Sequence, residues 1–270
     1  MTASQAAGPR VILAAICCQK GDWPANLAAH EEVLARARDE GCELAAFPEM
    51  SLTGSVDPVA HPGDLLRLDS EPVRAMAGLT RQYPVAAVFG VAERGDGGGA
   101  HITQVYAREG ALAGAYRKRH LGEGEDAYTP GTVPAVFRLG QLSFGIAICA
   151  ESRVDYPFDE PAAAGAEVIF LCAAPGLYGR RTDDESWRAG HSWWESQGLA
   201  DARRHAARTG ASVALTTQAG STVDEDFPGL AALVGPGGEV VARLPDWHPG
   251  TLVAGLDRRS GGARCHGRTG

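Results

Sequence analysis

Three polar residues stand at or just beyond the ends of strand-like stretches, and their side chains could together carry out nucleophilic chemistry. Glu49 follows a short apolar run, Lys118 follows a stretch of alternating apolar and polar residues, and Cys149 ends the apolar run 144–148. Short apolar runs of this kind predict buried strands, and open α/β sheets place their chemistry at strand ends. A thiol becomes a nucleophile when a base removes its proton. The pattern therefore predicts a base, an oxyanion stabiliser and a nucleophile around one cleft.

The segments around these residues resemble those that carry the Glu-Lys-Cys triad of the nitrilase, or carbon–nitrogen hydrolase, superfamily. In their order along the chain, the matching segments are Phe47-Pro48-Glu49, Tyr116-Arg117-Lys118-Arg119-His120-Leu121 and Ile148-Cys149-Ala150-Glu151. The resemblance extends from about residue 11 to about residue 257. It implies that Glu49 is the general base, that Lys118 stabilises the oxyanion and that Cys149 is the nucleophile.

A second acid is expected beside this triad. Family members place a glutamate ahead of a Tyr-Phe-x-Pro-Gly segment, and the resemblance implies that this glutamate orients the lysine and the substrate. Glu125 precedes Tyr128 by three residues, as that pattern requires. The segment that follows is one residue shorter here, so Glu123 and Asp126 remain alternatives to Glu125. Tyr128 is the matching candidate for a supporting or substrate-binding role.

Ala150 and Glu151 follow the candidate nucleophile directly and are further candidates for a supporting role. The backbone N–H of Ala150 is the expected second donor to the oxyanion. Nitrilases in the strict sense usually carry Trp after the cysteine, so Ala150 favours a small amide or N-carbamoyl compound as the substrate. The predicted function is hydrolysis of a non-peptide C–N bond through a cysteine thioester, without a metal or another cofactor. Nitrile hydrolysis by the same triad and a non-catalytic ligand-binding relative are the alternatives.

Two basic residues near the triad allow more than one interpretation. His120 could serve as the base of a Cys-His pair in place of the carboxylate. Arg153 could contact a carboxylate of the substrate, or it could form a structural ion pair with Glu151 or Asp155.

Composition and charge exclude several other classes of protein. The formal net charge of -8 argues against a nucleic-acid partner, because binding to a phosphate backbone depends on clustered Lys and Arg. The sequence contains no apolar run of 18 or more residues, and residues 1–10 lack the apolar stretch of a signal peptide. We therefore expect a cytoplasmic protein without membrane contact. Cys17, Cys18, Cys42 and Cys172 lie in or beside apolar runs and are expected to be buried free thiols.

The pattern of elements predicts one large mixed α/β domain. Strands are expected at residues 11–16, 44–49, 85–91, 102–107, 111–116, 133–139, 142–148, 168–171, 212–217, 229–234, 239–244 and 252–256. Helices are expected after Asp22, after Ser70 and over residues 157–164 and 199–207. The resemblance implies a four-layer α-β-β-α sandwich with two mixed sheets, and a homodimer or higher homo-oligomer. The expected domain covers residues 10–257, between a flexible N-terminus (1–9) and a basic tail (258–270) that is flexible or ordered by a partner subunit.

Two clusters of large side chains have no assigned role. Residues 187–194 include Trp187, His191, Trp193 and Trp194 without a clear period, and are expected to cover the pocket, a subunit interface or the core. A helical stretch further on carries three arginines, which predict a solvated face or structural ion pairs. They are Arg203, Arg204 and Arg208.

Overall fold

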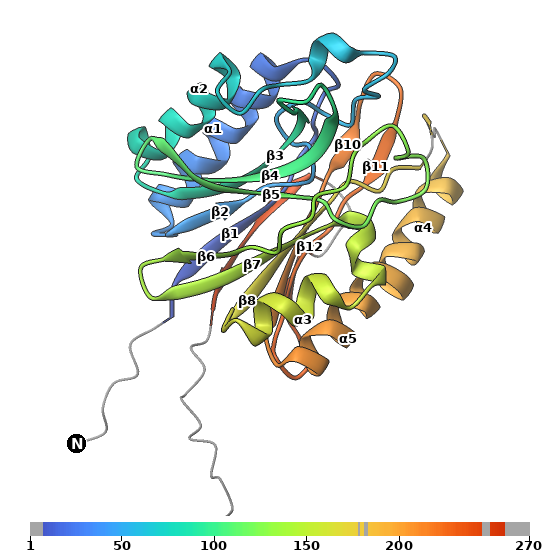
Figure 1. Ribbon diagram of the computed structural model, residues 1–270. Helices are drawn as coiled ribbons and strands as arrows, with labels where there is room; N and C mark the ends of the chain where they lie inside the picture. Colours follow the sequence, from blue (N-terminus) through green and yellow to red (C-terminus); the bar gives the residue numbers. More distant parts are fainter. Residues whose placement is uncertain (1–7, 178, 181–182, 245–248, 257–270) are drawn as a thin grey trace, which may run out of the picture.

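Two β-sheets pack face to face, and helices cover the outer face of each sheet (Figure 1). The computed structural model describes residues 8–177, 179–180, 183–244 and 249–256. The expected flexible N-terminus falls almost wholly outside these residues, and the expected tail lies outside them completely. The four layers are those that the resemblance implied.

The first sheet has six strands, of which the central ones are parallel. In sheet order they are β14 (Gly250–Gly255), β1 (Arg10–Ala15), β2 (Leu44–Ala46), β3 (Ala86–Arg94), β4 (Ala100–Arg108) and β5 (Ala111–Arg117). Since β3, β4 and β5 are successively antiparallel, β5 runs in the same direction as β2. The chain segments that carry Glu49 and Lys118 therefore leave the sheet at the same edge.

The second sheet repeats this arrangement. In sheet order its strands are β13 (Val240–Arg243), β12 (Ala231–Val234), β9 (Ser212–Thr217), β8 (Val168–Ala173), β7 (Leu142–Ile148) and β6 (Val136–Leu139). Its central strands β7, β8 and β9 are parallel, and Cys149 follows the carboxyl end of β7. The two short strands β10 (Ala219–Ser221) and β11 (Asp226–Pro228) form a separate hairpin.

Within the described ranges, five α-helices flank the sheets, together with three short helical turns. They are α1 (Trp23–Asp39), α2 (Glu71–Gln82), α3 (Tyr156–Ala163), α4 (Asp184–Trp193) and α5 (Leu199–Thr209), the 3₁₀ turns η1 (Pro62–Asp64) and η2 (Cys149–Arg153), and the π-helical turn η3 (Trp194–Gly198). The Asp22 side chain caps α1 by accepting a hydrogen bond from the Ala25 N–H at 3.1 Å. Ser70 also precedes its helix as expected, but its hydroxyl makes no capping hydrogen bond to α2.

Alternate residues of each strand pack into different hydrophobic cores, because neighbouring side chains of a strand point to opposite faces of the sheet. Leu13 of β1 and Phe144 of β7 belong to the core between the sheets. Ile12 of β1 packs with Leu34 of α1 in the core under the first helical layer. Ile169 of β8 lies in the third core, which α5 and η3 complete. The apolar strand runs are therefore buried on both faces.

Several expected elements differ in length from those observed. The strand expected at 133–139 begins only at Val136, because Pro134 has no N–H to donate to a sheet. β2 ends at Ala46, so Glu49 lies in the turn beyond the strand. The segment with Trp187, His191 and Trp193 is the helix α4, which the sequence pattern did not predict, and Trp194 begins the turn η3 that follows it. Cys18, Cys42 and Cys172 are buried free thiols, as expected, whereas Cys17 is only partly buried.

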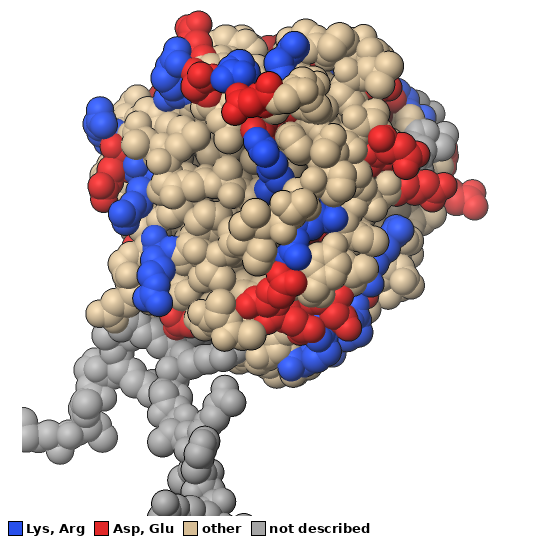
Figure 2. Space-filling view, in the orientation of Figure 1, with Lys and Arg blue, Asp and Glu red and all other residues tan. Residues whose placement is uncertain are grey.

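Charged side chains are dispersed over the surface. On the face shown in Figure 2, acidic and basic side chains interleave around a mostly uncharged centre. None of the described helices combines the length and the apolar character that a membrane span requires.

Candidate active site

Glu49 lies in a tight turn shortly after the end of β2, and its side chain is only 2% exposed. Met50 adopts a positive φ of 49°, a conformation that residues other than glycine rarely take. Gly90 of β3 allows the turn to approach closely, because a Cβ there would lie 2.2 Å from the Met50 nitrogen. Gln218 holds the same turn from the second sheet by donating its Nε2–H to the Glu49 carbonyl at 3.0 Å.

Lys118 follows β5 directly and is buried between two carboxylates. Its Nζ donates to Glu49 Oε1 at 2.8 Å and to Glu125 Oε1 at 2.6 Å. Its own backbone is fixed on both sides, since its N–H donates to the Ile102 carbonyl and its carbonyl accepts from the Gly131 N–H. The structure thus brings the predicted lysine and the predicted base into direct contact.

Cys149 begins the turn η2 with a positive φ of 44°. The Glu49 carboxylate and the Cys149 thiol influence each other's pKa, and the charge of Lys118 acts on both groups. Non-glycine residues in this conformation persist only where their surroundings enforce it, and they cluster at functional sites. The three predicted residues therefore meet around one point, although they come from two different sheets.

Burial sets the protonation states of this cluster. It raises the pKa of Glu49 above the usual carboxyl value against the lowering effect of Lys118, and Glu125 raises it further. Burial, together with the nearby Glu49 charge, raises the pKa of the Cys149 thiol to about 12. Burial alone would lower the pKa of Lys118, but Glu49, Cys149 and Glu125 outweigh it and raise that pKa. The resting cluster contains an ammonium and a protonated thiol.

The loop before Tyr128 supplies the second acid. Glu125 is the acid that contacts Lys118, and its other oxygen accepts the Gly122 N–H at 2.6 Å. Glu123 also lines the cavity but is exposed, and Asp126 is exposed outside the lining. Tyr128 donates its hydroxyl to the Val56 carbonyl at 2.7 Å and thereby braces the opposite wall.

Glu151 lies beneath the site and does not line the cavity. One of its carboxylate oxygens accepts the Ile148 N–H at 2.8 Å. The other accepts the Arg119 N–H at 2.7 Å and the Tyr116 hydroxyl at 2.9 Å. Of the two roles considered for Glu151, substrate contact does not fit this position; the carboxylate instead fastens the Cys149 turn to the chain around Lys118.

A cavity of about 840 Å³ is lined by Glu49, Cys149, Ala150 and Glu125, whereas Lys118, held between the two glutamates, is not among the described residues that line it. Much of its wall is apolar and includes Leu177, Trp193 and Trp194. Of Trp187, Trp193 and Trp194, the last two therefore line the pocket, which was one of the three positions predicted for this segment. Trp187 and His191 lie on the same helix without lining the cavity.

The two ambiguous basic residues occupy different positions. Arg153 is exposed and lines the cavity, and it forms no ion pair with any carboxylate in the described ranges. Asp155 pairs instead with Arg204 and Arg208, so the predicted structural pair for Arg153 is absent there. His120 is not among the described residues that line the cavity.

Sequence reasoning missed Gln218, which connects the second sheet to the Glu49 turn. A signal was present, because Gln218 directly follows β9 and so stands at the same sheet edge as Cys149. No cluster of His, Cys, Asp and Glu suited to a metal ion occurs among the residues that the structure describes.

Comparison with known proteins gives consistent matches. The profile of the carbon–nitrogen hydrolase family matches residues 10–264. A glutamine-dependent NAD(+) synthetase of Rhodobacter capsulatus is 25% identical over 92% of this chain and 44% of that protein. An aliphatic nitrilase of Rhodococcus rhodochrous is 34% identical over 32% of this chain and 27% of that protein. The chain thus spans less than half the length of these relatives.

Solved structures share the fold. An amidase variant from Nesterenkonia sp. AN1, with the acetamide moiety of fluoroacetamide added covalently at its active-site cysteine, has a TM-score of 0.78. It is 24% identical, with 95% of each chain covered. A glutamine-dependent NAD+ synthetase of Acinetobacter baumannii has a TM-score of 0.77 at 16% identity, over 93% of this chain and 46% of that one. Since the family profile spans nearly the whole sequence, this chain belongs to the carbon–nitrogen hydrolase family.

Proposed function

We propose that the protein hydrolyses the C–N bond of a small amide or N-carbamoyl compound, with Cys149 as the nucleophile. The observation that carries the proposal is the buried contact of Lys118 with Glu49 at 2.8 Å, at a cavity that both Glu49 and the Cys149 thiol line. A base, a cation and a nucleophile at one cavity are the groups that acyl transfer requires. Membership of the carbon–nitrogen hydrolase family supports the same reaction.

The reaction begins when Glu49 takes the thiol proton as the sulfur attacks the substrate carbonyl carbon. An ammonium has three N–H donors, and Lys118 uses two of them on Glu49 and Glu125. The third is left for the oxyanion, together with the backbone N–H of Ala150. When the C–N bond breaks, Glu49 returns the proton to the departing nitrogen. Glu49 then takes a proton from water, which attacks the thioester. When the C–S bond breaks, Glu49 passes that proton to the departing sulfur and the thiol is restored.

The raised pKa values suit this sequence of steps. A carboxyl with its ordinary pKa is a weak base at neutral pH, and burial strengthens Glu49 as a base. Because burial also raises the pKa of Cys149, the thiol keeps its proton at rest. The thiolate forms when Glu49 accepts the proton. This arrangement protects the nucleophile between turnovers.

A screen of released ammonia tests the proposal. Purified protein is incubated with primary amides, N-carbamoyl amino acids, N-carbamoyl amines, nitriles and glutamine, and the variant Cys149→Ala serves as the control. We expect ammonia from at least one amide or carbamoyl compound and none from the variant. Release from nitriles alone would indicate a nitrilase. Ligand binding without release from any compound would favour the non-catalytic alternative.

Arg153 favours substrates that carry a carboxylate at the end remote from the reacting carbonyl. It lines the cavity without an ion pair to the described acids, and an arginine is suited to bidentate contact with a carboxylate. The glutamine-dependent relatives make glutamine one compound of this class. We expect Arg153→Met to lower kcat/KM for an acidic substrate by about tenfold and to leave a neutral amide within about twofold. Equal losses on both substrates would contradict this assignment.

A further inference from the structure

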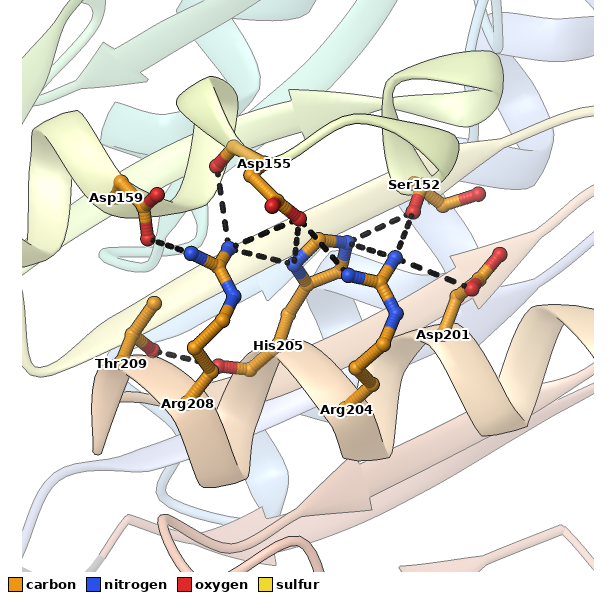
Figure 3. Close-up of polar contacts among 8 residues, drawn as sticks. All are labelled: Ser152, Asp155, Asp159, Asp201, Arg204, His205, Arg208 and Thr209. Carbon is orange, nitrogen blue, oxygen red and sulfur yellow. Dashed lines mark hydrogen bonds and ion pairs between the residues drawn. The ribbon is translucent and has the colours of Figure 1, made fainter.

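The turn that carries Cys149 is held from below by α5 as well as by Glu151. The Ser152 carbonyl, in the same turn η2, points away from the cavity toward this helix. It accepts a hydrogen bond from His205 Nε2 at 2.7 Å and one from Arg204 Nη2 at 3.2 Å (Figure 3). His205 is fully buried and stacks on Phe158 of α3, with the ring centroids 3.7 Å apart and the planes 3° from parallel.

These contacts fix the tautomer of His205. Nε2 lies 2.7 Å from the Ser152 carbonyl oxygen and 3.1 Å from Arg204 Nη2. Because a carbonyl oxygen can only accept and is the nearer of the two groups, we assign the proton to Nε2. Arg208 Nη2 lies 3.1 Å from Nδ1, which accepts from it and is therefore unprotonated. The ring is neutral and uses both nitrogens, one toward the Cys149 turn and the other toward α5.

The charges around the ring favour this neutral form. Arg204 and Arg208 flank it on α5, and Asp201 of the same helix pairs with Arg204. From the opposite side come Asp155, with Oδ1 at 3.9 Å from Nδ1, and Asp159, which pairs with Arg208. Burial lowers the pKa of His205, and the two guanidinium groups lower it further against the Ser152 hydrogen bond. Figure 3 shows the ring enclosed by these groups.

The Cys149 turn needs such support, because a single five-residue turn with Cys149 at a positive φ has little hydrogen bonding of its own. Glu151 fixes it from the side of β5, and His205 fixes it from the side of α5. The two attachments use consecutive residues, Glu151 and Ser152. Both residues lie within three positions of Cys149 in the same turn.

We propose that neutral His205 is a positioning residue for the nucleophile, and that it acts through its hydrogen bond to the Ser152 carbonyl. This inference rests on the proposed function, because a residue that aligns the Cys149 turn matters for catalysis only if Cys149 is the nucleophile. His205 does not line the cavity, so it does not touch the substrate. Losing its N–H should therefore slow the chemical step more than it weakens binding.

Two replacements separate the hydrogen bond from the packing of the ring. His205→Phe keeps an aromatic ring on Phe158 but removes the donor. His205→Gln loses the ring but places an amide N–H at about the reach of Nε2. Arg208→Gln is the matched control, because Arg208 belongs to the same cluster but does not contact the Ser152 carbonyl.

The primary readout does not depend on any substrate. The rate of alkylation of Cys149 by iodoacetamide is measured at about pH 8, where His205 is neutral, by mass spectrometry of the Cys149 peptide. We expect His205→Phe to lower this rate by about tenfold or more, since small misplacements of reacting groups have effects of that size. His205→Gln and Arg208→Gln should stay within about threefold of the parent protein.

Turnover of the best amide from the screen provides the second readout. For His205→Phe, kcat should fall about tenfold while KM stays within about twofold, and His205→Gln should recover most of kcat. Thermal unfolding of each variant shows how much folded protein is present. If no amide is turned over, the proposed function fails, but the alkylation rates still rank the variants.

Three results would overturn the inference. The first is an alkylation rate for folded His205→Phe within about twofold of the parent. The second is an equal loss in His205→Phe and His205→Gln, which would assign the effect to ring packing. The third is an equal loss in Arg208→Gln, which would assign it to the charge cluster. If His205→Phe does not fold, His205→Asn replaces it, because the shorter amide of asparagine does not reach the Ser152 carbonyl. Equal alkylation rates for His205→Asn and His205→Gln would again refute the positioning role of His205.

Discussion

Among single residues, Glu49 and Lys118 need opposite titration behaviour in the proposed reaction. Glu49 has to gain and lose a proton, and burial raises its pKa toward the range where both states are accessible. Lys118 has to keep its charge, and its two carboxylate partners outweigh the effect of burial on its pKa. The same buried pair thus gives one group that titrates and one that does not.

Replacing Glu49 by Gln separates the carboxylate base from the alternative base His120. We expect Glu49→Gln to lower kcat by about a hundredfold or more, because general base catalysis contributes effects of that size. His120→Gln should have little effect, since His120 does not line the cavity in the described structure. Steady-state rates on one amide check both. Near-normal turnover by Glu49→Gln would make His120 the better candidate.

The pH dependence of the reaction follows from the raised pKa of Glu49. The base works only when it is deprotonated, so kcat/KM should be low at acid pH and should rise with pH through the pKa of Glu49. That rise should lie above about pH 4.3, the ordinary value for a glutamate. Rates on a neutral amide between about pH 4 and pH 8 measure it. A rise centred at or below the ordinary value would mean that Glu49 is not the titrating base.

The sequence predicted the residues at the centre of the site better than those that support them. Glu49, Lys118 and Cys149 each lie beyond a strand, and their segments resemble a known family. Glu151 was recognisable as a neighbour of Cys149, but its partners on residues 116–120 become visible only when β5 and β7 are brought together. His205 gives no signal in the sequence, because its function depends on a carbonyl of another segment.

Among the elements, the helices show where local rules succeed and fail. Asp22 and Ser70 both precede their helices as expected, but only Asp22 caps its helix with a side-chain hydrogen bond. The helix α4 was missed because two of its large side chains are not on a core-facing stripe: Trp187 does not line the cavity and Trp193 is 39% exposed over it. None of the residues of α4 is fully buried, whereas α5, which was predicted, buries Leu199, Ala202, His205 and Ala206.

The two caps give a matched pair of substitutions. Asp22→Ala should lower the free energy of unfolding by about 1 kcal/mol, because it removes the acceptor of the Ala25 N–H. Ser70→Ala should change it by less than about 0.5 kcal/mol, since the buried Ser70 hydroxyl has no partner among the described residues. Urea unfolding of the two variants measures the difference. Equal losses would show that Ser70 caps α2 in solution.

For the molecule as a whole, the site exists only if the two sheets stay in register with each other. Glu49 and Lys118 come from the first sheet, and Cys149 comes from the second. The four-layer arrangement was predicted through the resemblance, since strand periodicity alone does not say which sheet a strand joins. The sheets are joined by side-chain packing in the core between them and by hydrogen bonds such as those of Gln218 and Glu151. A homo-oligomer remains a prediction that light scattering would test.

Phe144 is the side chain that most directly couples the two sheets. It is fully buried in β7 and contacts Tyr106 of the first sheet and Phe170 of the second, with ring centroids 5.1 and 5.4 Å apart. Phe144→Ala should therefore lower the free energy of unfolding by about 3–5 kcal/mol, the cost of a large cavity in a core. Phe144→Leu should cost less, because it fills part of that space.

The same variant shows whether the halves unfold together. Urea titrations with pulsed alkylation follow Cys42, buried beside the first helical layer, and Cys172, buried between the sheets. If the sheets form one cooperative unit, both thiols should become reactive at one urea concentration, and that midpoint should fall equally for both in Phe144→Ala. Separate midpoints would mean that each sheet folds with its own helices. Cys149 would then meet Glu49 and Lys118 only when the two folded halves, each one sheet with its helices, dock on each other. In that case Phe144→Ala would abolish alkylation of Cys149 at urea concentrations below those that unfold either half.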